Sequence, residues 1–186
     1  WHLPDGTTLT ANDSTSNANN GTLNNSPTAT AGNINGGASL TPTNSSISTT
    51  GTFSSFTPST FTVEWWINPT TLADFNQNIL ASASWGAFSC HSTALGEGYC
   101  GIDVSTRMSP ANIPSGTFVA GTWQHMVFTF NSGTGIFYKN GVQIASKGSM
   151  TSPSGNWTGF RVGDGSTTFN GKVDEVRVSD STRSAD

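Results

Sequence analysis

The sequence predicts an all-β protein folded as a two-sheet antiparallel sandwich. Short apolar stretches recur between clusters of Gly, Ser, Thr and Asn, which is the pattern of strands and turns. No stretch keeps the period of an amphipathic helix over a useful length. The pair Asn140-Gly141 separates two alternating apolar stretches, and this is the strongest local signal for a two-residue β-hairpin turn. These observations together favour a sandwich over any helical architecture.

The first half of the chain predicts short strands at 22–23 and 38–40, followed by one strong strand at 61–69. The apolar side chains of this strong strand alternate, so that one face is apolar while the other carries Thr62, Glu64 and Trp66. Pro69 ends the strand because it cannot donate to a sheet ladder.

The second half predicts strands at 79–84, 86–89, 99–104, 123–130, 136–139, 142–145, 160–163 and 172–178. The segment 123–130 is apolar on both faces, which is typical of a central strand covered on both sides. Core packing should take most of the large aromatic residues in these strands, namely Trp65, Trp66, Trp123, Phe128 and Phe130.

Length and composition limit the possible functions. A chain of 186 residues suits one domain, so we expect a single module spanning 1–186. Charged residues make up only 10% and the net charge is −4, so we expect neither nucleic acid nor an anionic membrane as partner. No apolar stretch is long enough to cross a bilayer. The chain opens at Trp1 without a signal peptide, and we expect a monomeric module cut from a larger secreted or cell-surface protein, bacterial by its composition.

The two cysteines, Cys90 and Cys100, flank a segment of turn-forming residues between β-forming stretches. This arrangement predicts a disulfide across the base of a hairpin, in agreement with an oxidising compartment. The alternative is a pair of free buried thiols. A zinc site lacks enough ligands, because only His91 lies close by in the sequence and a structural site takes four.

Five blocks of the sequence resemble the laminin G-like jelly-roll domains of the concanavalin A-like lectin/glucanase superfamily, and they occur in that family's order. They are the Asp- and Asn-rich stretch 13–22, the strand 61–69, the Trp-x-His strand 123–130, the hairpin 138–142 and the closing strand 171–178. The resemblance implies a complete jelly-roll sandwich. The region 82–116 matches no block.

The resemblance also implies a structural calcium ion, because in this family calcium commonly ties the first loop to the closing strand. Carried over to this sequence, the ligands are Asp13, Asn17, Asn19, the backbone around Gly21, and Asp174. Calcium takes 6–8 oxygen ligands of these kinds.

The sequence itself leaves alternatives open for the two acidic ligands. Asp174 alternates in step with Val176 and Val178, so the three side chains should point to the same face of the strand, toward the core. A carboxylate buried there needs a partner. Without a metal, Asp174 would bond to backbone amides or to Arg161, and Asp13 and Asn17 would cap turns through their own backbone.

Exposed aromatic residues predict a platform for sugar rings. Candidates in Gly- and Ser-rich surroundings are Trp85, Tyr99 and Trp157, with His91, Glu97 and Asp103 as polar neighbours. The alternative for each aromatic residue is burial in the core.

Catalytic motifs are missing from the sequence. A retaining glycosidase of this fold would place two carboxylates on one face of a strand, and the sequence contains no run of acidic residues spaced in this way. None of His2, His91 and His125 is accompanied by a nucleophile elbow. We therefore expect a non-catalytic, calcium-stabilised carbohydrate-binding module. The alternatives are a structural or protein-binding adhesive sandwich without a sugar site, and a glycoside hydrolase or polysaccharide lyase.

Overall fold

The computed structural model describes residues 1–3, 8–41, 44–49, 59–73, 77–82, 88–102, 105–153, 157, 159–163 and 169–183. For residues 77–82 it describes the backbone only. These residues form strands and no helix, as the sequence predicts. The strands are β1 (Gly21–Asn24), β2 (Thr28–Ala31), β3 (Gly36–Ser39), β4 (Ser46–Thr49), β5 (Thr60–Pro69), β6 (Gln77–Ser82), β7 (Phe88–Ser92), β8 (Gly98–Ile102), β9 (Gln124–Asn131), β10 (Thr134–Lys139), β11 (Val142–Lys147), β12 (Phe160–Val162) and β13 (Gly171–Ser179).

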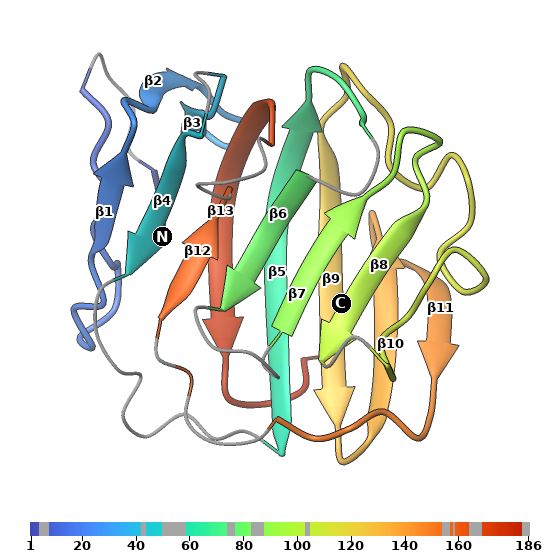
Figure 1. Cartoon of the computed structure of the whole chain (residues 1–186). Coiled ribbons are helices and arrows are strands. Elements are labelled where there is room, and N and C mark those ends of the chain that lie inside the picture. Colours follow the sequence, from blue (N-terminus) through green and yellow to red (C-terminus); the bar gives the residue numbers. More distant parts are fainter. Residues whose placement is uncertain are drawn as a thin grey trace.

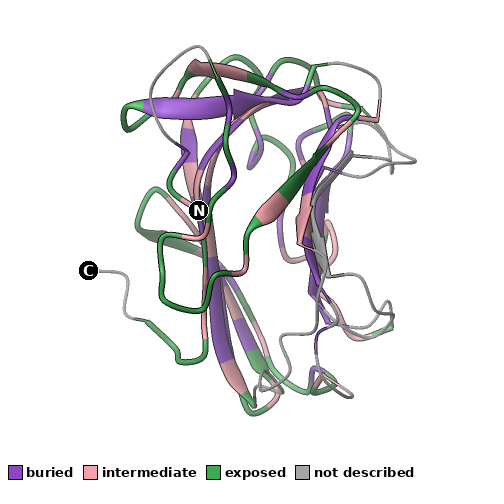
Figure 2. Cartoon of the chain, turned by 90° about the vertical axis from the view of Figure 1, so that its left-hand side faces the viewer, coloured by how far each residue is buried: buried purple, intermediate pink, exposed green. Residues whose placement is uncertain are grey.

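Two antiparallel sheets form the sandwich. Sheet A has the strand order β1-β4-β12-β6-β7-β8, and sheet B has the order β11-β10-β9-β5-β13-β3-β2. Figure 1 looks onto sheet A, with sheet B behind it. Figure 2 shows the two sheets edge-on as separate layers. Each sheet therefore has one face on the core and one face turned away from it. No helix among the described residues is long and apolar enough to span a membrane.

The central strand β5 shows why this sequence makes a sandwich. Its inward row, Phe61, Val63, Trp65 and Ile67, is fully buried. The ring of Phe61 packs against Phe130 of β9 in the same sheet, at 5.4 Å between centroids, and against Phe88 of β7 in sheet A, at 6.1 Å. Aromatic contacts of this kind across the two layers supply much of the burial that holds the sheets together.

The predicted hairpin is confirmed. Asn140 and Gly141 both have positive φ, 50° and 78°, which a type I′ turn requires. The side chain of Asn140 also accepts a hydrogen bond from the backbone N–H of His125, at 2.8 Å. The turn that joins β10 to β11 is thereby fixed to the start of β9.

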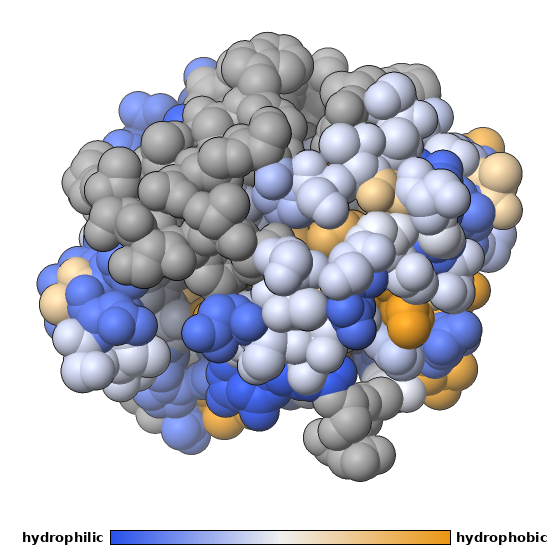
Figure 3. Space-filling model, turned by 90° about the horizontal axis from the view of Figure 1, so that it is seen from below, coloured by the Kyte–Doolittle hydropathy of each residue, from blue (hydrophilic) through white to orange (hydrophobic). Residues whose placement is uncertain are grey.

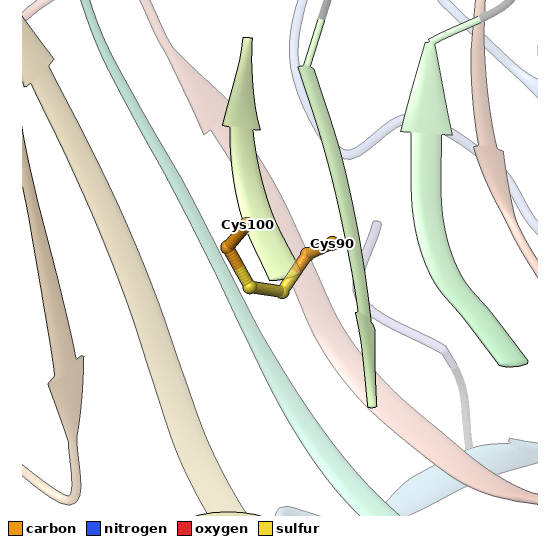
Figure 4. The surroundings of a disulfide bond; sticks show 2 residues. All are labelled: Cys90 and Cys100. Carbon is orange, nitrogen blue, oxygen red and sulfur yellow. A yellow bond between two sulfur atoms is a disulfide. The ribbon is translucent and has the colours of Figure 1, made fainter. Parts of the chain in front are cut away.

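The predicted disulfide is present as well. Cys90 on β7 and Cys100 on β8 are directly opposite each other in the ladder and are joined by a disulfide. Figure 4 shows the bond lying between these two neighbouring strands of sheet A. Both cysteines are fully buried.

The closing strand β13 contains an irregularity that the sequence pattern did not indicate. Its register against β5 shifts between Asp174 and Arg177, and Glu175 has a φ of +46°. This bulge interrupts the alternation of side chains between the two faces of β13. Val173 and Val176 are buried on the core side. Asp174 is paired opposite Trp66, whose side chain points away from the core. The expectation that Asp174 shares the row of Val176 is therefore wrong.

Candidate functional site

The loop that precedes β1 is organised around Asp13. The Oδ1 atom of Asp13 accepts a hydrogen bond from the N–H of Thr15 at 2.9 Å, and Oδ2 accepts one from the N–H of Asn19 at 2.8 Å. Although burial acts to raise the pKa of Asp13, these amide hydrogen bonds hold it below its usual value. Asp13 thus carries a negative charge that the backbone of its own loop supports.

Asp174 is held elsewhere, beneath the turn between β2 and β3. It is fully buried, and its Oδ2 atom accepts hydrogen bonds from the N–H groups of Asn33 and Ile34, both at 2.9 Å. Its Oδ1 atom accepts a third from Glu175 at 2.7 Å. Burial raises the pKa of Asp174, and the three amide donors act against that rise. These contacts match the backbone-amide alternative considered for this residue.

Only part of the predicted metal set comes together. Asp13, Asn17 and Asn19 line one open hollow with a volume of about 720 Å³, beside the last residues of β13, whereas Asp174 does not line it. Gly21 begins β1, where its N–H donates to the carbonyl of Ala11. Within the described residues, no three His, Cys, Asp or Glu side chains lie close enough to hold one ion. A calcium ion at this hollow would therefore depend on Asp13 together with amide and carbonyl oxygens.

The hairpin of β7 and β8 brings two of the predicted sugar contacts together. The rings of His91 and Tyr99 stack at 5.1 Å with 21° between their planes, and the Arg107 guanidinium lies over Tyr99 at 4.8 Å. Glu97 lies in the turn between these strands, where its carboxylate accepts a hydrogen bond from Thr93 Oγ1 at 3.1 Å. Burial, and secondarily Arg107, lowers the pKa of His91 to about 4. Trp85 and Asp103 lie outside the described residues.

Trp157 corrects the predicted platform. It is fully buried and stacks on Phe160 at 6.3 Å with 5° between the planes, and it also meets Phe61 edge-on at 5.2 Å. Its Gly- and Ser-rich surroundings favoured exposure, but the rings of Phe61 and Phe160 give the indole an apolar place in the core. Trp157 therefore belongs to the core and supplies no surface for a ligand.

A second aromatic pair lies on the outer face of sheet B, and it includes Trp66, which the sequence interpretation assigned to core packing. Trp66 on β5 pairs directly with His125 on β9, and the two rings stack at 5.0 Å with 30° between their planes. Both residues are half-buried. The signal for this position was present in the sequence, because Trp66 alternates with Thr62 and Glu64, and polar neighbours in a row indicate the face away from the core.

Charged groups surround this pair. Glu64, the next outward residue of β5, forms an ion pair with Arg177 of β13 at 3.1 Å. Arg183 Nε and His125 Nε2 lie 3.8 and 3.9 Å from the same carboxylate. Burial lowers the pKa of His125, Glu64 acts to raise it and Arg177 lowers it further. His125 is therefore mainly neutral at neutral pH.

The same row continues toward β10. Glu64 pairs with Val127 of β9, and Val127 pairs with the half-buried Tyr138 of β10. Cross-strand partners share a face, so the outer side of sheet B combines aromatic rings with charged groups at its centre. We call this set the central face; it consists of Glu64, Trp66, His125, Tyr138, Arg177 and Arg183.

Solved structures with the same architecture include sugar-binding and receptor-binding domains. Domain 4 of AbnA, an extracellular arabinanase from Geobacillus stearothermophilus solved with arabinotriose, matches with a TM-score of 0.73 at 19% identity, covering 96% of this chain and 93% of that one. The binding domain of botulinum neurotoxin DC in complex with SialylT matches with a TM-score of 0.68 at 10% identity, covering 98% of this chain and 47% of the toxin domain.

The same toxin domain in complex with rat synaptotagmin II matches with a TM-score of 0.67 at 11% identity, covering 98% of this chain and 48% of that one. This chain thus spans about half of each toxin domain. At these identities the similarity shows the fold alone.

No curated protein matches the sequence significantly. The sequence does match one family, a laminin G-type family described as the concanavalin A-like lectin/glucanases superfamily, over residues 41–186. That range includes β4 to β13 and every residue of the central face. This chain belongs to the concanavalin A-like lectin/glucanases superfamily.

Proposed function

We propose that this chain is a non-catalytic carbohydrate-binding module of a secreted or cell-surface protein, and that its ligand lies on the central face. The stacked pair of Trp66 and His125 carries the proposal. A half-exposed aromatic pair at the middle of an open sheet offers a flat apolar surface to the C–H face of a sugar ring. The charged groups of Glu64 and Arg177, beside the pair, can bond to sugar hydroxyls.

The surroundings of the carboxylates support binding without hydrolysis. Glycoside hydrolysis uses two carboxyl groups, one as acid and one as base or nucleophile. Glu64, on the central face, is ion-paired with Arg177. Asp174, which is paired opposite Trp66, is buried and accepts hydrogen bonds from three backbone amides. The similarity to an arabinanase domain solved with arabinotriose supports a polysaccharide as ligand.

Calcium is part of the proposal as a stabilising ion. Asp13, Asn17 and Asn19 share the hollow at the first loop, and hard oxygen donors of these kinds suit calcium.

Figure 3 shows the lower end of the molecule, where the coloured residues are largely hydrophilic and hydrophobic ones form small separate patches. The coloured part of this end therefore shows no extended apolar patch of the kind that binds an apolar partner.

Affinity electrophoresis and isothermal titration calorimetry with soluble polysaccharides, arabinan first, test the proposal. Replacing Trp66 by Ala should weaken binding more than about tenfold, because a central aromatic contact dominates the affinity of such a surface. The matched control is Tyr99→Ala, which removes the aromatic platform of the other sheet and should leave binding unchanged.

The two variants also separate the two candidate faces. Loss of binding in Tyr99→Ala, with binding retained in Trp66→Ala, would place the ligand on the β7–β8 hairpin instead. If no polysaccharide binds to the wild-type protein, the protein-binding alternative replaces the proposal. Circular dichroism and thermal melting of each variant will check that its fold is intact.

A further inference from the structure

Positive charge gathers on the central face of a protein that is acidic as a whole. The chain has 7 Lys and Arg against 11 Asp and Glu. Arg177 and Arg183 both lie within ion-pair distance of Glu64, and Lys172 is paired opposite Asn68, in the outward row of β5. Three cations thus lie along one face.

Two carboxylates on the outer side of sheet B have restricted access. The Glu64 side chain is only 17% exposed, and Asp174 is fully buried under the β2–β3 turn. By contrast, the side chains of Arg177 and Arg183 are 53% and 47% exposed. A ligand on the outer side of sheet B therefore meets the guanidinium groups before it meets Glu64 or Asp174, whereas Asp13 and Asp180 line the hollow on the first-loop side of both arginines.

Both arginines are held in place. Arg177 contacts Glu64 through Nη1 at 3.1 Å. The chain around Arg183 is fixed to β5, because its N–H donates to Thr62 Oγ1 at 3.0 Å and that hydroxyl donates to the carbonyl of Ser181 at 2.8 Å. Each guanidinium has five N–H donors in a fixed planar fork, so most of its donors stay available after it meets Glu64.

The aromatic pair and the arginines are close enough to serve one ligand. Glu64 and Trp66 are two residues apart on β5, which corresponds to about 7 Å along the strand. That separation is near the length of one sugar unit. A sugar ring over Trp66 and His125 can therefore direct a carboxylate toward Arg177 and Arg183, the planar partners that guanidinium groups bind best.

We propose that the central face selects carboxylated glycans, that is, polysaccharides containing uronic acid or related acidic sugars, with Arg177 and Arg183 as the specificity-determining residues. This inference rests on the proposed function and adds the class of ligand. In it, Glu64 competes with the ligand carboxylate for the two arginines.

Calorimetry with matched pairs of ligands tests the inference. The probes are oligogalacturonate, oligomannuronate and hyaluronan oligosaccharides, each compared with the same oligomer after its carboxylates have been reduced to alcohols. We expect at least one acidic oligomer to bind about tenfold or more tightly than its reduced counterpart, as expected for charge-assisted hydrogen bonds. The preference should shrink as NaCl screens the charges.

Three variants sharpen the test. Arg177→Gln and Arg183→Gln should each lose the preference for the acidic oligomer while still binding the reduced one. Glu64→Gln should strengthen binding of the acidic oligomer alone, because it removes the competing charge at nearly constant shape. The control is Lys147→Gln, a cation on the edge strand β11 whose Nζ donates to the carbonyl of Arg107, and it should change nothing.

Equal affinity for acidic and reduced oligomers would overturn the inference and leave the proposed function standing. Failure of every oligomer to bind would overturn it as well, and the polysaccharide experiment with Trp66→Ala would then decide the proposed function separately. Weaker binding of the acidic oligomer to Glu64→Gln would also contradict the competition assigned to Glu64.

Discussion

Asp174 keeps its carboxylate inside the protein because the chain brings three backbone amides to it. The approach is very close at Gly32 in the β2–β3 turn. A Cβ atom on Gly32 would lie 2.2 Å from the carbonyl oxygen of Gly36 and 2.6 Å from Asp174 Oδ2. Glycine at this position therefore allows the turn to fold over the carboxylate.

Replacing Gly32 by Ala should destabilise the fold by about 1 to 3 kcal/mol, because the backbone must move away from the added methyl group. Urea unfolding measures the change. The control is Gly148→Ala, where an added Cβ meets no heavy atom within 4 Å. Equal stability of the two variants would contradict the close packing at Gly32.

His91 links the fold to pH. Its pKa falls to about 4 from an ordinary value of 6.5, mainly through burial. Between these values the unfolded chain binds a proton that the folded chain does not, so the unfolding free energy falls as pH is lowered from 6.5 toward 4. Between pH 7 and pH 5 the loss due to His91 should be about 2 kcal/mol.

The difference between wild type and His91→Phe isolates this contribution. Phenylalanine keeps a ring next to Tyr99 but cannot take up a proton. The unfolding free energy of the variant, measured in urea at pH 7 and pH 5, should depend less on pH than that of the wild type. Parallel pH profiles would show that His91 is not the titrating group.

At the scale of the elements, the β7–β8 hairpin combines a ladder with a covalent link. The disulfide closes a segment with a sequence separation of 10, and it limits the freedom of the unfolded chain. The double variant Cys90→Ala/Cys100→Ala should lose about 2 to 4 kcal/mol of stability. Urea unfolding with and without reductant checks this. Reductant should destabilise only the wild type, and an equal effect on both proteins would contradict the role of the bond.

The elements that sequence reasoning found are those specified locally. The strand at 61–69 and the hairpin at Asn140-Gly141 depend on alternation and on turn chemistry, which operate within a few residues. The bulge after Asp174 could not be read in this way, because the amides that bind the Asp174 carboxylate come from the β2–β3 turn, in a distant part of the chain. Reading β13 as a regular strand therefore placed Asp174 in the wrong row.

The candidate site was harder to predict than the fold for the same reason. Cys90, Cys100, His91 and Tyr99 come together because they lie on one local hairpin. The central face instead depends on the neighbours of β5, since β9 supplies His125 and β13 supplies Arg177. Alternation with Thr62 and Glu64 indicates that Trp66 faces away from the core, but only the pairing between strands brings His125 and Arg177 to the same face.

At the scale of the whole molecule, two open sheet faces carry different groups. The outer side of sheet A has the His91–Tyr99–Arg107 stack near one edge, and the outer side of sheet B has the central face around β5. The hollow at the first loop lies beside the end of β13, and Arg177 and Arg183 line it too. A calcium ion there would stabilise the loop next to the residues that we assign to ligand binding.

Calcium added to chelator-treated protein should therefore raise the melting temperature, because an ion that binds only the folded state stabilises it by mass action. At a concentration about a hundredfold above its Kd, the rise for a domain of this size should be about 5 to 10 °C. Differential scanning calorimetry measures it. Asp13→Asn should abolish the rise, whereas Glu97→Gln, on the distant β7–β8 turn, should keep it. A melting temperature that excess chelator leaves unchanged would rule out the ion, and the amide hydrogen bonds of Asp13 and Asp174 would then account for the order of both segments.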